Sequence, residues 1–204
     1  MPLHSNWTNK IRNSLIITAF GLSVGMNYVI MKKQCDYKLL SIKKECRHEI
    51  ESCKEKMWFK DIDKLSTWVY RHSNRISFRE ARTIVEKTIK ISNNPILLLA
   101  IMCEESHFNP KAISKSGAIG LGQILPNKYQ LNLLKKNEII KDKRDLFDIE
   151  TNIRATEFIF SLKLKKANGN IQKALKYYLG GNSEKYVNDI LKNIGEMFCF
   201  ITKK

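Results

Sequence analysis

The chain has 204 residues, of which 43% are hydrophobic, and this suits one globular domain of ordinary size with an appendage. Nine glycines and four prolines are too few for a low-complexity or collagen-like chain. The formal net charge is +16, and the excess of lysine and arginine is spread along the chain instead of forming a tail. A positive charge of this size favours binding to nucleic acid, anionic lipid or cell-wall polymers, and it is equally consistent with a role in solubility alone. Because no recognised nucleic-acid-binding motif accompanies it, we do not expect nucleic acid as a partner.

An uncharged segment near the N-terminus predicts a membrane anchor. Residues 13–31 carry no charge, and as a helix they would span roughly 28 Å, about the hydrocarbon thickness of a bilayer. No small-residue cleavage pattern closes the segment, so an uncleaved anchor is favoured over a signal peptide, with a buried core helix as the alternative. The six lysines and arginines in residues 32–47 favour a cytoplasmic position for the following chain. We assign residues 1–34 to an N-terminal tail and membrane anchor.

Residues 35–60 are charged, contain neither glycine nor proline, and predict a helical stalk or a short coiled coil. On one helix Cys46 and Cys53 would lie roughly 10.5 Å apart, too far to bridge each other. Each can pair with a second copy in an oxidising compartment, or remain a free thiol at a small apolar position. The chain contains no Cys-x-x-Cys pair and no ligand cluster of cysteine and histidine, so we expect neither a metal site nor a cofactor.

Residues 61–204 predict an all-α domain, because apolar residues recur at helical spacing and no strand pattern of period two stands out. A helix is expected within residues 61–75, and Ser77–Glu80 forms a capping box that begins the next. The expected apolar face of that second helix consists of Phe78, Ala81, Val85 and Ile89.

A third helix begins at Asn94, which caps it, and takes Pro95 at its first position. Its sequence, PILLLAIMCEE, is apolar nearly all round, which predicts a buried central helix with Cys103 in the core. Two acids, Glu104 and Glu105, stand at its end.

The rest of the domain is predicted as a loop followed by three helices. Residues 109–126 are expected to be mostly loop, and helices are expected to begin at Asp148, at Asn170, and at Asn182 or Ser183. The apolar stripes expected on the first and last of these helices are Ile149, Ile153, Phe160 and Leu164, and Val187, Ile190, Leu191, Ile194 and Phe198.

Glu105 is the candidate catalytic residue. A carboxyl group at the end of an apolar helix loses hydration, which favours the neutral acid and raises its pKa. An acid that stays protonated near neutral pH can donate a proton to a leaving oxygen, as glycosidic cleavage requires. The following loop contains Gly117, Gly120 and Gly122, which permit close backbone approach, and Gln123, which offers a donor and an acceptor to a sugar. For a lone glutamate, a helix end that reaches solvent is the alternative.

The chain contains three notable stretches, ESHFNPKAISKSGAIGLGQILP at residues 105–126, LFDIETNIRAT, and ALKYYLGGNSEKYVNDIL. The first resembles the signature of the soluble lytic transglycosylases, relatives of goose-type lysozyme. The other two resemble later motifs of that family, and the three occur in the order of the family over about residues 76–195. The matching residues are Glu105, Ser106, Phe108, Asn109, Pro110, Ser114, Gly117, Ala118, Gly120, Leu121, Gln123, Pro126, Leu146, Phe147, Asp148, Asn152, Ile153, Tyr178, Gly181, Tyr186 and Val187.

The resemblance implies a lysozyme-like domain that cleaves peptidoglycan glycan strands at the bond between N-acetylmuramic acid and N-acetylglucosamine. Glu105 would act first as acid and then as base, and the product would be a 1,6-anhydro ring. Ser106, Ser114, Gln123 and Tyr178 would contact saccharide or position Glu105. Glu104 stands at a position that the family leaves variable, and we interpret it as a bystander. The domain would face the periplasm and the cell wall, opposite to the side that the flanking lysines favour.

The chain differs from the family pattern at three positions. Gly122 replaces the usual methionine, Leu179 replaces an asparagine, and Ile149 replaces a proline. Two other functions therefore stay open, a hydrolytic muramidase that uses the same glutamate and a catalytically weakened component that binds the wall. The resemblance also leaves open whether the protein remodels the wall or serves a secretion, conjugation or phage machine.

Overall fold

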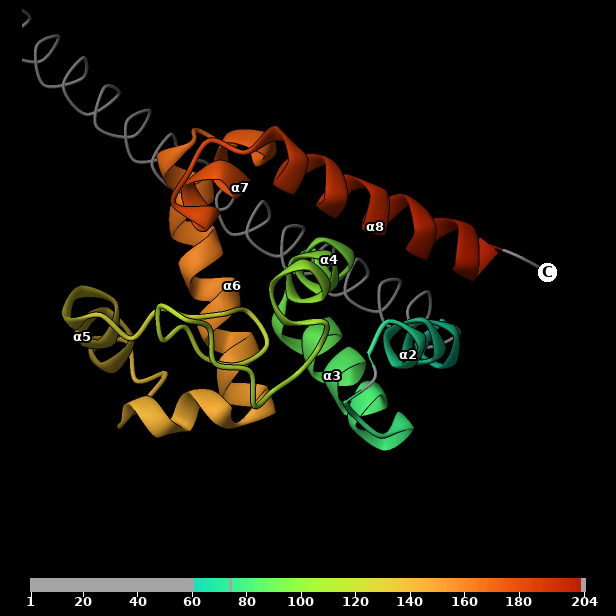
Figure 1. The fold of residues 1–204 in the computed structure, drawn as a ribbon, viewed down its shortest axis with the longest axis horizontal. Helices are drawn as coiled ribbons and strands as arrows, with labels where there is room; N and C mark the ends of the chain where they lie inside the picture. The colour runs from blue at the N-terminus through green and yellow to red at the C-terminus, as the bar shows by residue number, and fades with distance from the viewer. Residues whose placement is uncertain (1–60, 74, 203–204) are drawn as a thin grey trace, which may run out of the picture. The chain divides into compact units, whose positions relative to one another are not determined.

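A computed structural model describes residues 61–73 and 75–202, and these residues form seven α-helices and one short 3₁₀ helix (Figure 1). In chain order they are α2 (Ile62–Arg71), α3 (Phe78–Ile91), α4 (Pro95–Ser106), α5 (Lys128–Lys136), η1 (Lys143–Phe147), α6 (Ile149–Lys166), α7 (Ile171–Leu179) and α8 (Glu184–Thr202). Two isolated β-bridges occur in the loop before α5, and no strand occurs among the described residues. The prediction of an all-α domain is confirmed.

The predicted anchor, residues 13–31, and the predicted stalk, residues 35–60, lie outside the described residues, and both stay predictions. Among the helices that the structure describes, none has the length and apolar character needed to span a bilayer.

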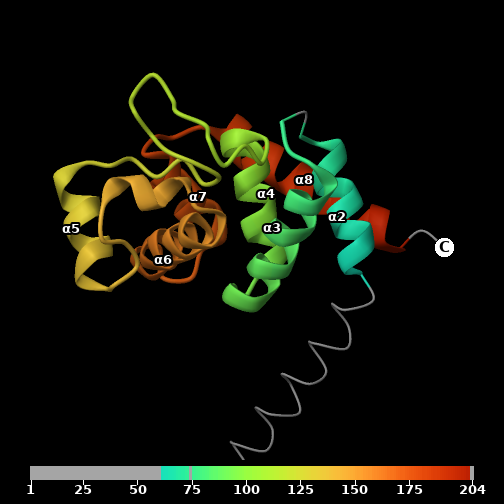
Figure 2. The same cartoon turned by 90° about the horizontal axis from the view of Figure 1, so that it is seen from below.

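Helix α4 lies at the centre of the larger core, with α3 and α8 packed against it (Figures 1 and 2). All nine residues from Pro95 to Cys103 are buried, as the apolar sequence predicts. The side-chain oxygen of Asn94 accepts a hydrogen bond from the backbone N–H of Leu97, so the expected cap is present. Because α4 has apolar neighbours along its whole length, the carboxyl groups at its end are held next to the core.

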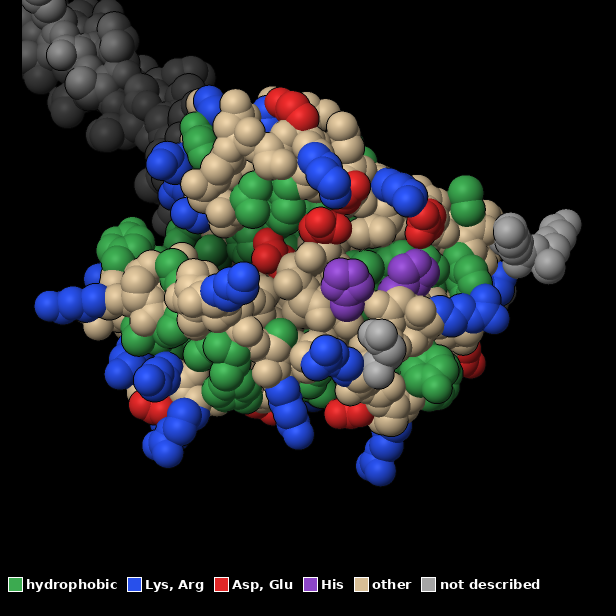
Figure 3. Space-filling model, viewed as in Figure 1, with side chains coloured by type: hydrophobic (Ala, Val, Ile, Leu, Met, Phe, Trp, Pro, Cys, Tyr) green, Lys and Arg blue, Asp and Glu red, His purple; other side chains and the backbone are tan. Residues whose placement is uncertain are grey.

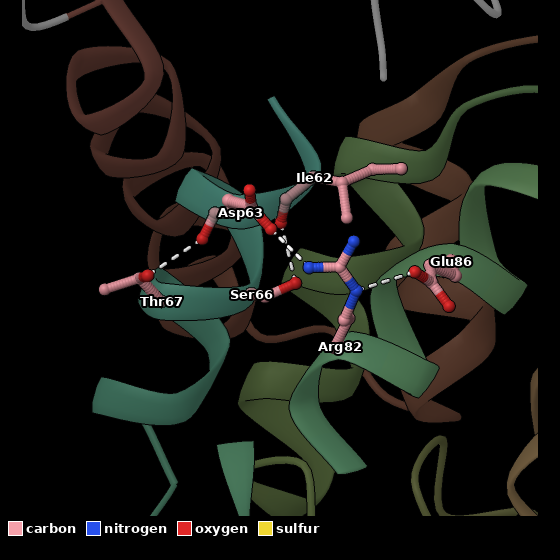
Figure 4. Close-up of polar contacts among 6 residues, drawn as sticks. All are labelled: Ile62, Asp63, Ser66, Thr67, Arg82 and Glu86. Atoms are coloured by element: carbon pink, nitrogen blue, oxygen red, sulfur yellow. Dashed lines mark hydrogen bonds and ion pairs between the residues drawn. The ribbon is translucent and has the colours of Figure 1, made fainter. Parts of the chain in front are cut away.

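Helices α2 and α3 pack side by side through Leu65, Trp68 and Val69 of α2 and the buried face of α3. Polar contacts lie beside this interface (Figure 4). The Arg82 guanidinium donates to Glu86, at 2.8 Å, and to Asp63, bridging α3 to α2. Such exposed ion pairs are weak because water and salt screen them, so the apolar contact carries most of the stability.

The predicted capping box of α3 is confirmed, since Ser77 and Glu80 bond each other's backbone N–H groups. The expected apolar face of α3 is correct for Ala81 and Val85, which are fully buried. It is wrong for Phe78, which is 43% exposed and packs edge-to-face on Tyr70, with ring centroids 6.0 Å apart. Phe78 stands in the first turn of the helix, beyond the edge of the core.

A second, smaller core joins α5, η1 and one side of α6 to the loop before α5. Its buried members are Ile119, Ile124, Leu134, Ile140, Leu146, Ala155 and Ile159. Helix α6 serves both cores, because Ile153 and Phe160 belong to the first and Ala155 and Ile159 to the second. The end of α7 lies at the junction, where Tyr178 packs against both cores.

The buried face of α8 differs in part from the expected apolar stripe. Val187 and Ile190 are buried as predicted, but Leu191 is 41% exposed and Phe198 is 51% exposed. Met197, the neighbour of Phe198, is fully buried in its place. A helix turns by about 100° per residue, so a one-residue change in the assigned stripe moves a side chain from the core to the surface.

Candidate active site

A sharp turn ends α4 at His107, two residues after Glu105. His107 and Phe108 both adopt left-handed backbone angles, with φ of 49° and 57°, which non-glycine residues rarely do. The Phe108 ring is fully buried and lies edge-to-face against Trp68, with centroids 6.0 Å apart. Burial of this ring offsets the cost of the turn, roughly 1–3 kcal/mol for each such residue.

The buried side chain of Asn152 holds the glycine-rich loop in place. Its amide oxygen accepts from the N–H of Gly122 at 2.9 Å, and its amide nitrogen donates to the carbonyls of Ile119 and Leu146 at 3.0 and 2.7 Å. Gly120 must lack a side chain here, because a Cβ atom would lie 2.1 Å from the Asn152 amide nitrogen. One fully buried amide therefore ties the loop to α6 and η1.

Thr156 on α6 explains why residue 122 has no side chain. A Cβ atom at residue 122 would lie 2.0 Å from Oγ1 and 2.7 Å from Cγ2 of Thr156. Thr156 is fully buried, and its hydroxyl donates to the backbone carbonyl of Asn152 at 2.8 Å. Thr156 thus fills the space that a side chain at residue 122 would need, and the departure from the family pattern at Gly122 is matched by local packing.

This packing predicts that Gly122→Met alone is destabilising and that removal of the Thr156 side chain reverses part of the loss. We expect Gly122→Met to lower the free energy of unfolding by at least about 2 kcal/mol through overpacking. The Gly122→Met/Thr156→Gly variant should be more stable than Gly122→Met, although glycine within a helix costs about 1 kcal/mol. Urea unfolding of wild type, both single variants and the double variant measures the coupling, and additive effects would contradict the account.

The Glu105 carboxyl group accepts a hydrogen bond from the hydroxyl of Tyr186 on α8 at 2.5 Å. Burial of the carboxyl group raises its pKa to about 7, the Tyr186 hydrogen bond opposes that rise, and the nearby charge of Glu104 adds to it. Burial also raises the pKa of Tyr186, so its hydroxyl keeps its proton and remains a donor. Near neutral pH the Glu105 carboxyl group is therefore divided between its acid and base forms.

A cavity of about 360 Å³ opens beside Glu105, between the loop and α7. The space-filling view shows hydrophobic side chains in a hollow on this face, with acidic side chains beside it and lysine and arginine side chains around it (Figure 3). The lining residues are Glu105, Ser114, Ser116, Ala118, Gln123, Ile124, Leu125, Gln130, Ile159, Lys163, Tyr177, Tyr178, Leu179 and Gly180. Glu105 supplies the sole carboxyl group among them, and Glu104 does not line the cavity.

The structure brings four of the five predicted site residues, Glu105, Ser114, Gln123 and Tyr178, to this cavity. Ser114 lies 2.9 Å from the Ser116 hydroxyl, oxygen to oxygen, and accepts from the N–H of Ala118. The Gln123 amide nitrogen donates to the Gly120 carbonyl at 2.9 Å.

Two of the predicted residues donate a hydrogen bond from their hydroxyl group to a backbone carbonyl of the loop. Tyr178 donates to the Gly122 carbonyl at 2.7 Å, which fixes the loop from the side of α7. Ser106 donates to the Leu121 carbonyl at 2.8 Å and does not line the cavity. The structure therefore places Ser106 as a link between α4 and the loop, away from the space open to a ligand.

Two residues of this site are absent from the predicted site residues, namely Tyr186 and Asn152. Both match the family motifs, which is the signal that marks them in the sequence. Spacing alone does not show that Tyr186 faces Glu105, 81 residues earlier in the chain. Among the described residues, no group of three or more histidine, cysteine, aspartate or glutamate side chains could hold a metal ion.

A family model and two similar proteins indicate the same family. The family model described as "Transglycosylase SLT domain" matches residues 82–191, more than half of the chain. Two proteins named "Membrane-bound lytic murein transglycosylase C", from Yersinia pestis (strain Pestoides F) and Yersinia pseudotuberculosis serotype O:1b (strain IP 31758), are each 40% identical to this chain over 80 residues. The match covers 38% of this chain and 22% of the length of each relative. No solved structure matches the chain significantly.

Proposed function

The chain belongs to the transglycosylase SLT domain family, and we propose that it is a lytic transglycosylase that cleaves peptidoglycan glycan strands. The observation that carries the proposal is Glu105, a half-buried acid at the edge of a cavity, with its pKa raised to about 7. The names of the matched relatives, lytic murein transglycosylases, support the same activity.

In the proposed reaction, Glu105 first donates its proton to the oxygen that joins N-acetylmuramic acid to N-acetylglucosamine. The carbonyl oxygen of the muramyl N-acetyl group attacks the anomeric carbon as that bond breaks, which forms a cyclic intermediate. The Glu105 carboxylate then takes the proton of the muramyl 6-hydroxyl, whose oxygen displaces the N-acetyl oxygen. The product carries a 1,6-anhydro ring, and Glu105 regains its proton.

This scheme fits a cavity with one carboxyl group. Retaining and inverting glycosidases generally place two carboxyl groups about 5–10 Å apart across the bond that breaks. Among the described residues that line the cavity, Glu105 has no such partner. An internal nucleophile supplied by the substrate removes the need for the second group, which supports the proposal.

Tyr186 sets the acidity of Glu105, so Tyr186→Phe is expected to change the pH profile of cleavage. The Tyr186 hydrogen bond lowers the pKa of Glu105, and its loss should raise that pKa further. The alkaline fall in kcat/KM, expected near pH 7 in wild type, should move to higher pH by about one unit. Kinetics of fragment release between pH 5 and 9, with Tyr70→Phe as a surface control, measure this shift. An unchanged profile, or a shift to lower pH, would contradict the assigned role.

We also propose that the enzyme is anchored in a membrane through residues 13–31 and acts on the envelope side. Support comes from the uncharged segment and from the words "membrane-bound" in the names of the matched relatives. Association with secretion, conjugation or phage machinery remains a proposal that rests on the wall-cleaving activity. Protease accessibility of the domain in intact cells measures its orientation.

The first test of the activity is simple. The full chain is incubated with purified peptidoglycan, and release of soluble glycan fragments is followed over time. Release that depends on Glu105 supports an enzyme. Binding to the wall without release would instead support the wall-binding component.

A further inference from the structure

A second cavity adjoins the first along α5 and α6. Its volume is about 700 Å³, within the range of ligand-binding sites, roughly 300–1,000 Å³. It is lined by Asn127, Lys128, Tyr129, Gln130, Leu133, Ile159, Leu162, Lys163 and Lys166. Gln130, Ile159 and Lys163 line both cavities, so a ligand that occupies the first can extend into the second.

The second cavity is positively charged. Lys128, Lys163 and Lys166 line it without any acidic residue, and none of the three forms an ion pair with a described residue. Lys128 is also the first residue of α5, whose first turn contains no acid. A lysine there opposes the helix dipole, and together with the helix terminus it concentrates positive potential at the cavity.

The second cavity also has apolar walls. Tyr129 is 75% exposed and Leu162 is 37% exposed, and both line the cavity, so apolar surface faces the same space as the lysines.

We propose that this second cavity binds the acidic peptide that the muramyl residue of the substrate carries. The inference rests on the proposed function and adds a determinant of substrate choice to it. The sugar backbone of a peptide-bearing strand is uncharged, whereas the peptide has carboxylates that can pair with the lysines. The shared lining residues connect the cavity that holds the reacting bond to the cavity that holds the peptide.

The test compares soluble glycan strands that carry uncross-linked peptides with the same strands after an amidase has removed the peptides. Amidase treatment leaves one lactyl carboxylate on each muramyl residue, so the two substrates differ in the carboxylates and amides of the peptide itself. The readout is the ratio of kcat/KM for the peptide-bearing strands to kcat/KM for the peptide-free strands. Lys128→Glu in the full chain should lower this ratio by about fivefold to tenfold, because an attraction becomes a repulsion. Lys128 is chosen because Lys166 also lies over the Tyr177 ring, 4.8 Å from its centroid, and Tyr177 lines the first cavity.

Lys136→Glu is the matched control, because it makes the same charge change on the exposed last turn of α5 and lines neither cavity. Leu162→Trp, which fills the second cavity without changing charge, should lower the ratio as well. An unchanged ratio in Lys128→Glu, or an equal fall in Lys136→Glu, would overturn the proposal.

Failure of the proposed function gives a different result, since wild type would then cleave neither substrate. In that case calorimetry of a peptide-bearing muramyl disaccharide with the full chain still decides the matter. Binding that exceeds that of the peptide-free disaccharide and weakens about fivefold in Lys128→Glu supports the peptide site. Equal binding of the two disaccharides would overturn it.

Discussion

Glu105→Gln is expected to lower the rate of glycan cleavage by a factor of about 100 to 10,000, the usual contribution of general acid–base catalysis. Glutamine has nearly the same shape and can still accept the Tyr186 hydrogen bond, but it has no acidic proton to donate. The measurement is the initial rate of fragment release from purified peptidoglycan. Because the substituted side chain keeps its neighbours, binding of the chain to peptidoglycan should survive.

The same substitution has a stability signature with a defined sign. The pKa of Glu105 is raised to about 7 in the folded protein from the ordinary glutamate value of 4.5. The folded state therefore binds the proton more tightly than the unfolded state, and the free energy of unfolding falls as pH rises from about 4.5 to about 7. Glu105→Gln removes that fall, so it should stabilise the fold above pH 7 by up to about 3 kcal/mol relative to its effect at pH 4.

Glu104→Gln is the matched control for both measurements. Glu104 neighbours Glu105, is likewise partly buried, and does not line the cavity. We expect this variant to keep its rate within a few-fold of wild type. Glu104→Gln losing as much activity as Glu105→Gln, or Glu105→Gln retaining wild-type activity, would refute the assignment of the acid.

Asn152→Ala is expected to destabilise the domain by about 3 kcal/mol or more. The fully buried amide makes three hydrogen bonds, to Gly122, Ile119 and Leu146. Its removal leaves the Gly122 N–H and the Leu146 carbonyl buried without that partner, at a cost of roughly 1–3 kcal/mol for each group, and relaxation of the loop recovers part of this cost. The Ile119 carbonyl keeps the hydrogen bond from the N–H of Ile124. Urea unfolding measures the loss, which should be accompanied by loss of activity because the loop carries the cavity wall.

Asn132→Ala provides the comparison, since Asn132 lies exposed on α5 and a surface substitution there should stay within about 0.5 kcal/mol of wild type. If Asn152→Ala is as stable as that control, the loop is held by something other than the Asn152 amide.

Local sequence patterns predicted the helices that carry the site. Helix α4 combines a cap at Asn94, a proline at its first position and an unbroken apolar run, so its start, its burial and the acid at its end all follow from neighbouring residues. The same holds for the capping box of α3 and for Asp148, which caps α6 by accepting from the N–H of Thr151.

Features that depend on distant contacts were not predicted. Helix α5 buries only Leu134, and η1 is a single short turn that buries only Leu146, so neither has an apolar stripe to reveal it. Tyr186 faces Glu105 because α8 packs on α4. The reason for Gly122 lies 34 positions later, at Thr156, and becomes visible only when the loop is seen against α6.

The candidate site shows the same division. The motif residues identified Glu105, Ser114, Gln123 and Tyr178, which meet at one cavity. Motif membership does not distinguish a side chain that faces the cavity from one that supports it. Ser106 and Asn152 both match the motifs, yet both form hydrogen bonds with the backbone of the loop and neither lines the cavity.

We propose that Glu105 closes an anhydro ring instead of activating water, and the mass of the released products tests this step. Fragments released from purified peptidoglycan by the full chain are separated and weighed by mass spectrometry. We expect muramyl ends with a 1,6-anhydro ring, each lighter by one water than the hydrolysed fragment, and we expect no such fragments from Glu105→Gln. Fragments of the hydrolysed mass would contradict the claim and identify a muramidase that uses the same acid.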